Sequence, residues 1–523
     1  MNIHETTDSS NMVSGAGSNE PALRGNGFTY RHNWGKKRGS QKLRLNWSSI
    51  TPRSLVFVSI AEGAAGGPNS GKFIGAARYT LHNVAPRNGG VDIWVDINWR
   101  SNIPLYVDYL VINPPGSELR TVSVIVHRHP TVSLTNADAD RILADMGTTL
   151  QRSDSSPDVA TPIRFVRSGS VRTLPASVSG TIQTAEQWRA LMAAGTGVKV
   201  VQAIRWCGGP GGSIIGCAPV GSARMNLAVV RFTSNQEGIL WAHEYGHNTG
   251  SGHRQDDTRA LMYPSIGSNH NVINQTESQR FLTGPQPSTA ATIEAACCHD
   301  GEESMKPPAD IHEFVTQHWF EGVPYGAASQ YTDTDAQQLI EMLVEEPEKY
   351  EEFLPEIVTT LCFIGSEDAV EPLINFVEGP LQSQSAFDAK NAALIHLGDL
   401  INTSGSTKAF DFLARMATST ESAKAVAKPR VSMQAMAAEK TDITVPELDT
   451  VAAELAVSAI FGLALSGTKE GQQVVEKLQS KPDLLSSVKL AAAEAEEIAE
   501  EVQSAKDQKE YYRLKSSGNK PSQ

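Results

Sequence analysis

The sequence predicts a multidomain chain with three folded parts: an N-terminal antiparallel β-sandwich, a central α+β domain and a C-terminal all-α region. Three observations support this order. Short runs of alternating apolar and polar residues fill 27–117, strand-like and helix-like runs are mixed over 118–285, and Ala, Leu and Glu dominate 331–500. Apolar residues at every second position are typical of half-buried strands, and apolar residues with a period near 3.6 are typical of helices. The three parts therefore differ in architecture.

Composition limits the partners that we expect. The chain of 523 residues has 45 Lys and Arg against 58 Asp and Glu and no basic block, so we expect no nucleic-acid partner. No apolar run reaches the roughly 18–20 residues of a spanning helix, so we expect no membrane span. Residues 1–26 are rich in Ser, Gly and Asn, which predicts disorder, and they contain no charged-then-apolar signal peptide.

The β-sandwich is predicted over 27–117. Its apolar-alternating runs are separated by Gly and Pro turns and lie at 43–47, 55–60, 91–99 and 106–112. Such spacing is typical of short antiparallel strands. Trp94 and Trp99 are expected to be exposed, which would suit a module that binds carbohydrate or protein. A purely structural sandwich would show the same alternation, so both roles remain open.

The α+β domain is predicted over 118–285. Its expected elements are a strand at 120–127, a helix that Thr135 caps and that runs to Met146, a strand at 163–166, a helix at 185–193, strands at 198–204 and 226–232, and a helix at 275–282. Between the last two, Ser234 and Glu237 have the S-x-x-E spacing of a capping box before the apolar run 239–242. This helix therefore has an apolar face to bury against the sheet.

The same helix carries H-E-x-x-H at His243, Glu244 and His247. Positions i and i+4 lie on one helix face, so both imidazoles can point at one metal ion, and Glu244 can reach a water on that ion. At Gly250 the chain can turn sharply, because glycine adopts a positive φ without steric cost. The turn brings back His253 as a third nitrogen ligand. Three protein ligands leave a fourth position open, as in a catalytic zinc site.

Nine residues beyond His253 lies Met262, in the string Ala-Leu-Met-Tyr-Pro. H-E-x-x-H-x-x-G-x-x-H followed by a methionine turn resembles the metzincin clan of zinc endopeptidases, and the resemblance covers about 118–285. The Ala-Leu-Met-Tyr-Pro string is similar to the matrixin branch, and His247-Asn248-x-Gly250 to the adamalysin branch. Arg254 stands where matrixins usually have Ser, so we assign the clan and no branch.

The resemblance implies a zinc-dependent endopeptidase. Zinc would activate a water molecule, and Glu244 would accept its proton as the water attacks a peptide carbonyl and later deliver it to the leaving amine. Met262 would form a tight turn beneath the metal, packing rather than ligating. The strand that ends at Phe232 would pair with an extended protein or peptide substrate. Metzincins are mostly secreted or cell-surface enzymes, which favours secretion, although no signal peptide is visible.

The five cysteines leave the redox compartment open. Cys207 and Cys217 bracket a glycine-rich loop and could close a small disulfide in an oxidising compartment or remain free thiols. The stretch 205–210 also resembles the cysteine-switch segment that keeps matrixins latent. It lies inside the catalytic domain rather than in a preceding propeptide, which argues against that role.

After a linker predicted at 286–330, the region 331–500 is interpreted as HEAT-like helical repeats. Three stretches each place a glycine and a Ser or Thr N-cap between two amphipathic helices, and the glycines are Gly365, Gly405 and Gly467. The first two are 40 residues apart, as in a HEAT-like pair, and the wider second gap is interpreted as a loop insertion at 418–442. An ordinary α-bundle is the alternative. Stacked pairs would offer an extended surface to a protein partner, and the charged tail 501–523 is expected to fray.

Two other functions remain possible from the sequence. One is a protein-interaction scaffold whose metzincin-like domain is regulatory or inactive. The other is a zinc-bound but inactive binding protein, against which Glu244 argues, because a structural zinc site has no use for a carboxylate at that position. No residue indicates hydrolysis of a bond other than a peptide bond.

Overall fold

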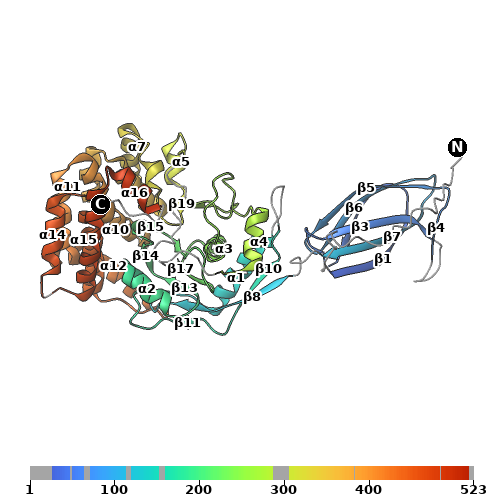
Figure 1. Ribbon diagram of the computed structural model, residues 1–523, viewed down its shortest axis with the longest axis horizontal. Helices are drawn as coiled ribbons and strands as arrows, with labels where there is room; N and C mark the ends of the chain where they lie inside the picture. The colour runs from blue at the N-terminus through green and yellow to red at the C-terminus, as the bar shows by residue number, and fades with distance from the viewer. Residues whose placement is uncertain are drawn as a thin grey trace, which may run out of the picture. The chain divides into compact units, whose positions relative to one another are not determined.

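The computed structural model describes residues 26–47, 50–63, 71–113, 119–151, 160–286, 305–381, 383–482 and 484–516. The chain divides into two compact units, Met1–Leu119 and Arg120–Gln523, whose elements are labelled in Figure 1. Of the stretch 1–26, for which we predict disorder, residues 1–25 lie outside the described residues, and Asn26 is the first residue of a strand.

The first unit is built from two antiparallel sheets. One has the order β1 (Asn26–Lys37), β7 (Ile103–Asn113), β3 (Leu55–Gly63) and β4 (Lys72–Phe73), and the other β2 (Gly39–Asn46), β6 (Gly90–Asn98) and β5 (Arg78–Arg87). Alternate residues of β6 and β7 point into one core that both sheets share, among them Ile93, Val95, Val107 and Tyr109. The predicted antiparallel β-rich N-terminal region is therefore confirmed.

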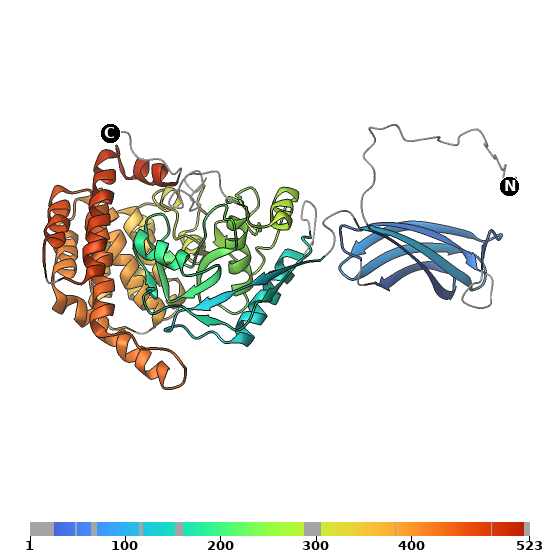
Figure 2. The ribbon, with the colours of Figure 1, turned by 60° about the horizontal axis from the view of Figure 1, so that its bottom comes forward.

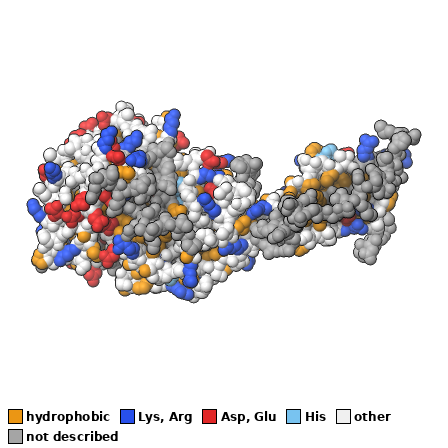
Figure 3. Space-filling model, in the orientation of Figure 1, with side chains coloured by type: hydrophobic (Ala, Val, Ile, Leu, Met, Phe, Trp, Pro, Cys, Tyr) orange, Lys and Arg blue, Asp and Glu red, His pale blue; other side chains and the backbone are white. Residues whose placement is uncertain are grey.

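Several large apolar side chains of this unit remain exposed. Trp94 and Trp99 are each 37% exposed, as expected from the sequence. Leu55, Phe57 and Leu110 are exposed as well, and Phe57 lies directly opposite Leu110 on the neighbouring strand. Hydrophobic side chains also gather on the face of the first unit that is drawn in Figure 3.

The second unit begins with a mostly parallel sheet. Its order is β11 (Arg172–Thr173), β9 (Val126–Arg128), β13 (Gly197–Val201), β17 (Asn226–Val230) and β16 (Gly216–Cys217), with only β16 antiparallel to its neighbour. Two smaller sheets are β8 (Arg120–Val124) with β10 (Ile163–Arg167), and β12 (Thr181–Ile182) with β14 (Ala203–Trp206) and β15 (Pro210–Ile214). All five residues of β13 are buried, so this strand lies at the centre of the domain.

Four helices accompany these sheets: α1 (Asn136–Gln151), α2 (Ala185–Ala193), α3 (Glu237–Asn248) and α4 (Gln275–Thr283). α1 and α3 share one core with the parallel sheet. The capping box that we predict at Ser234 is wrong, because α3 begins at Glu237 and Gln236 is its N-cap. The Glu237 carboxylate instead lies 2.7 Å from Arg141 and 2.6 Å from Arg231, so it does not reach back to cap the helix.

The segment 286–330, which we predict to be a linker, is folded over its described part, 305–330. It contains α5 (Ile311–Val315), β19 (His318–Trp319) and α6 (Tyr325–Ala328), and β19 pairs antiparallel with β18 (Ser265–Ile266). Phe314, Trp319 and Phe320 are buried. The linker interpretation is therefore wrong here: these aromatic residues follow no simple period, yet they belong to the core.

The C-terminal region is all-helical, as predicted. Its α-helices are α7 (Asp333–Val344), α8 (Leu354–Ile364), α9 (Val370–Glu378), α10 (Gln384–Ser404), α11 (Thr407–Thr418), α12 (Thr420–Ala438), α13 (Leu448–Leu465), α14 (Lys469–Gln479), α15 (Ser486–Ser504) and α16 (Gln508–Ser516). α8, α10, α13 and α15 contact one another in that order, and α9, α11 and α14 lie along them. Figure 2 shows these helices, coloured orange to red, stacked beside the sheets of the same unit.

The glycine signals lie at helix ends. Gly365, Gly405 and Gly467 have φ of 76°, 72° and 62°, and Ser406 and Thr468 then cap the next helices through their side chains. The predicted loop insertion at 418–442 is wrong, because α12 occupies most of it. The described part of the predicted tail does not fray either, since Tyr511 on α16 is buried.

Helix α13 is long and strongly apolar. Among the described helices it alone is long and apolar enough to cross a membrane by length and composition, and 67% of that span is buried within the protein. Its neighbours are α10, α11, α12 and α15. α13 therefore lies at the centre of the helical region.

Candidate metal centre

Three histidines meet at the end of α3. His243 and His247 lie one turn apart on the helix, and His253 comes back from the loop that follows it. Their ligand nitrogens all lie within 4.8 Å of one another, so the group could hold a metal ion. His243 and His247 are buried and His253 is half-buried. The structure thus brings together the three ligands that the sequence predicts.

The ring nitrogens of two of these histidines are oriented by backbone carbonyls. Nδ1 of His243 lies 2.8 Å from the oxygen of Leu261, and Nδ1 of His247 lies 2.8 Å from that of Ser251. A carbonyl oxygen can only accept, so each Nδ1 carries the proton and each Nε2 presents a lone pair. Such second hydrogen bonds fix the orientation of a metal-binding histidine.

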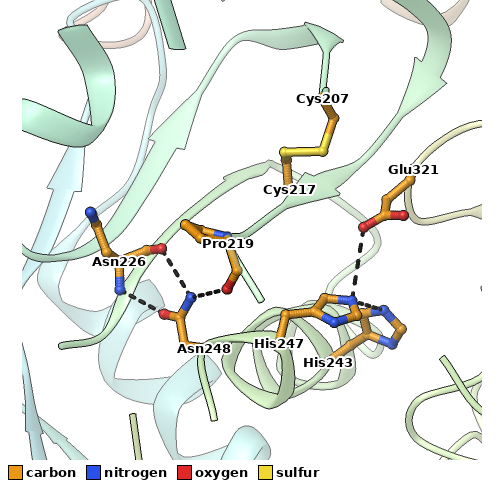
Figure 4. The surroundings of a disulfide bond; sticks show 8 residues. All are labelled: Cys207, Cys217, Pro219, Asn226, His243, His247, Asn248 and Glu321. Carbon is orange, nitrogen blue, oxygen red and sulfur yellow. Dashed lines mark hydrogen bonds and ion pairs between the residues drawn. A yellow bond between two sulfur atoms is a disulfide. The ribbon is translucent and has the colours of Figure 1, made fainter. Parts of the chain in front are cut away.

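The two Nε2 atoms lie 3.0 Å apart (Figure 4). Burial lowers the pKa of His247 to about 4 and holds the pKa of His243 well below its ordinary value, so both rings are neutral. Two lone pairs at this distance repel each other unless a cation binds both. Zinc binds imidazole nitrogen at about 2.0–2.1 Å, which allows a separation of this size. The histidines therefore fit a divalent metal ion.

The turn after α3 is fixed by two residues. Gly250 has a φ of 84°, so glycine is required there, as the sequence predicts. Asn248 is buried, and its amide accepts from the N–H of Asn226 at 2.6 Å and donates to the carbonyls of Pro219 and Asn226, each at 3.2 Å (Figure 4). From the sequence, Asn248 is only one position of the motif, and no role of its side chain is predicted. Its side chain ties the end of the helix to β17.

Met262 is fully buried next to α3. A Cβ built on Gly246 would lie 2.4 Å from the Met262 sulfur, so only glycine fits between the two ligand histidines at this point. The preceding residue, Leu261, supplies the carbonyl that orients His243. The segment around Met262 therefore packs against the helix and positions one ligand.

Glu244 directly follows His243 on α3 and is fully buried. Among the described residues, neither of its carboxyl oxygens has a hydrogen-bond partner. Burial raises the pKa of Glu244 well above its ordinary value, and the charge of Glu321 adds to this effect. A Cβ on Gly216 would lie 2.2 Å from Oε1 of Glu244, so the carboxyl lies directly against β16. This arrangement gives the site a buried group that binds a proton tightly.

Two further residues at the site were missed by sequence reasoning. The ring of Phe320 stacks on that of His243, with centroids 3.6 Å apart and an interplanar angle of 9°. The side chain of Glu321 is fully buried, and its Oε1 lies 3.9 Å from Nε2 of His247 (Figure 4). Both residues lie in the segment that we predict to be a linker. The local sequence indicates this role only by one acidic residue, Glu321, that follows the aromatic residues Trp319 and Phe320.

Cys207 and Cys217 form a disulfide that closes the loop containing β15 (Figure 4). Of the two states open from the sequence, the structure has the bridge. Cys207 is therefore engaged, which excludes the cysteine-switch interpretation of 205–210. Cys362 is buried and free, and Cys297 and Cys298 lie outside the described residues.

The expected role of β17 as a partner for substrate is wrong. β17 pairs with β13 on one side and with β16 on the other, so it is an internal strand. The stretch from Ile214, at the end of β15, to Gly216, at the start of β16, contacts Glu244 through Gly216. No protein-family model matches this chain, and no curated protein matches it.

Proposed function

We propose that the chain is a zinc-dependent endopeptidase. The observation that carries the proposal is the pair of neutral rings of His243 and His247, which present two Nε2 lone pairs at 3.0 Å, with the fully buried Glu244 on the same turn of α3. A structural zinc site is closed by four protein ligands and needs no adjacent proton acceptor. Three imidazoles with a buried carboxyl beside them are the parts of a hydrolytic site.

Zinc bound at the three histidines would polarise the attacking water and the peptide carbonyl and stabilise the negative charge that develops on the carbonyl oxygen. Glu244 takes up a proton during the attack, which is the role of a general base. It then returns the proton to the departing amine. His243 and His247 keep their orientation throughout, because Leu261 and Ser251 hold their Nδ1 protons.

The proposal extends to the finer fold assignments. A metal-binding helix packed on a mostly parallel sheet, with Gly250 at the turn and Met262 packed against the helix, supports a metzincin-like domain. The ordered row α8, α10, α13 and α15, with α9, α11 and α14 alongside, supports HEAT-like pairs over a bundle. The two sheets around one core support the β-sandwich. The disulfide supports an oxidising compartment and hence secretion.

One observation favours the alternative, a protein-interaction scaffold with an inactive or regulatory metal domain. Phe320 and Glu321 lie against His243 and His247, where a substrate carbonyl would have to approach. A test of activity must therefore include a variant in which this cover is reduced.

The test is cleavage of a proteome-derived peptide pool, with cleavage sites mapped by mass spectrometry. Glu244→Ala is compared with the wild type, and Glu321→Ala with the double variant Glu321→Ala/Glu244→Ala, all at equal zinc content. We expect Glu321→Ala to cleave peptides and Glu321→Ala/Glu244→Ala not to cleave them. Equal cleavage with and without Glu244 in both pairs would reject the proposed function.

A further inference from the structure

A segment of the chain itself crosses the three-histidine group in extended form. This cleft segment is 318–322, with the sequence His-Trp-Phe-Glu-Gly. On one side its first two residues pair antiparallel with β18, and the N–H of Phe320 donates to the carbonyl of Pro264 at 3.0 Å. The segment therefore adds a strand to the stretch that follows Met262.

Its other side is bonded as well. The carbonyl of Phe320 accepts from the N–H groups of Ile215 at 3.0 Å and Gly216 at 3.1 Å, and Glu321 forms an antiparallel bridge with Ile214. An extended peptide that binds along a strand makes main-chain hydrogen bonds of this kind. The cleft segment thus lies between the two backbones that flank the metal site and occupies the course that an extended substrate would take.

The cleft continues beyond the segment. A groove of about 910 Å³ is lined by Ile215, Phe232 and His318 at the start of the segment. A second, smaller pocket is lined by Glu321 and Gly322 at its end. The segment therefore has a cavity at each of its two ends.

Two side chains of the segment point at the ligand histidines. Phe320 stacks on His243 at 3.6 Å, and the Glu321 carboxylate lies 3.9 Å from Nε2 of His247. Zinc binds carboxylate oxygen at about 2.0–2.2 Å and imidazole nitrogen at about 2.0–2.1 Å. Two ligand atoms on opposite sides of one ion are up to about 4.2 Å apart, and in a tetrahedral shell they are closer together. The Glu321 carboxylate lies beside the three-histidine group rather than within it, and would join the shell of the same ion by a shift of its side chain toward that ion.

We propose that Glu321 is a fourth protein ligand of the metal and that the cleft segment 318–322 holds the peptidase in a latent form. This inference rests on the proposed function. In the latent form, the position that water and the substrate carbonyl require is filled from within the chain.

The helical region holds both ends of the cleft segment. At its first residue, Nδ1 of His318 lies 3.1 Å from Oε1 of Glu356 on α8, and the His318 ring stacks on that of Phe353. After it, the ring of Tyr325 stacks on Tyr512 of α16, with centroids 4.4 Å apart. The helices therefore hold the segment in place through these contacts, and activation requires the contacts to break.

The test uses the full chain with Glu321→Ala, the isosteric Glu321→Gln, and Glu345→Ala as an exposed glutamate control on the helical region. Folding of each is checked by thermal unfolding. Zinc affinity is expected to fall at least tenfold in both Glu321 variants and to stay unchanged in the control. The cobalt-substituted Glu321 variants are expected to change their visible spectrum with acetohydroxamate, whereas the wild type binds this ligand at least tenfold more weakly. Peptide cleavage is expected to rise at least tenfold.

The outcomes separate the latent form from the proposed function. Unchanged zinc affinity and unchanged acetohydroxamate binding in a folded Glu321 variant would overturn the fourth-ligand assignment. Wild-type cleavage as fast as that of the variants, and dependent on Glu244, would overturn latency and leave the peptidase function standing. If the ligand effects occur but no form cleaves peptide, the peptidase function fails and Glu321 remains a metal ligand. If Glu321→Ala does not fold, the zinc affinity and the acetohydroxamate binding of Glu321→Gln test the proposal.

Discussion

The Nε2 atoms of His243 and His247 face each other at 3.0 Å while both Nδ1 atoms donate to backbone carbonyls. Without a cation between them, two lone pairs are held together in a buried site. The unfolded chain has no such arrangement, so a metal ion would bind the folded form preferentially. Metal binding and folding would therefore be coupled.

Removal of the metal by EDTA is expected to lower the melting temperature of the chain. Zinc present at a hundred times its Kd stabilises the folded form by about 2.7 kcal/mol, and chelation removes this contribution. Differential scanning calorimetry with and without EDTA measures the effect. His247→Ala, which lacks one ligand, should be nearly insensitive to EDTA. A wild-type melting temperature that EDTA leaves unchanged would contradict a metal bound at this site.

Gly216→Ala is expected to lower peptide cleavage by more than about tenfold, because a positioned proton acceptor contributes about 10²–10⁴-fold to such reactions. The added Cβ would lie 2.2 Å from Oε1 of Glu244 and would displace the carboxyl. Gly209→Ala is the matched control, since no atom lies within 4 Å of its Cβ position. Both variants are compared in the Glu321→Ala background at equal zinc content. Equal rates for the two would show that Glu244 does not need its present position.

Loss of the Cys207–Cys217 bridge is expected to reduce the free energy of unfolding by about 2–3 kcal/mol, because the denatured chain regains the freedom of the loop. The bridge closes a sequence separation of 10 residues around β15. Guanidinium unfolding is measured for the wild type and for Cys207→Ser/Cys217→Ser, with and without dithiothreitol. The reductant should lower the stability of the wild type to that of the variant and leave the variant unchanged. A wild type that does not respond would contradict the bridge.

The contact between His318 and Glu356 is expected to stabilise the fold most at acidic pH. Burial alone would lower the pKa of His318, but the charge and hydrogen bond of Glu356 outweigh it and raise this pKa above 6.5. The stabilisation is therefore complete below pH 6.5 and is lost as the pH rises through the raised value. The difference in unfolding free energy between the wild type and His318→Gln should shrink over that range. A difference that grows with pH would contradict this sign.

Local signals in the sequence predict much of the second unit. The helix expected at 185–193 has these bounds in the structure, and Gly250 has the positive φ that the turn requires. H-E-x-x-H is also a local signal, because helix geometry alone places His243 and His247 on one face. His253 lies beyond the helix, and its prediction depends on the turn at Gly250, which is also a local signal.

Contacts between distant segments could not be predicted in this way. Glu321 reaches the metal site only because the cleft segment pairs with β18 and with Ile214, and a single sequence does not specify strand pairing. The internal position of β17 depends on sheet order, which is equally non-local. At Glu237, tertiary ion pairs override a local capping pattern.

In the helical region, one helix could not be predicted because its own sequence has no clear helical pattern. The stretch 418–442 has few apolar residues at helical spacing, so it resembles a loop, yet α12 forms there and packs on α13. Tertiary packing rather than a strong apolar stripe stabilises this helix.

X-ray absorption at the zinc edge of the purified full chain tests the metal centre most directly. We expect one zinc per chain with three imidazole nitrogens and one oxygen at about 2.0–2.1 Å, and only two imidazoles in His253→Ala. Absence of bound zinc, or a wild-type shell with fewer than three imidazoles, would contradict the central claim that His243, His247 and His253 share one metal ion.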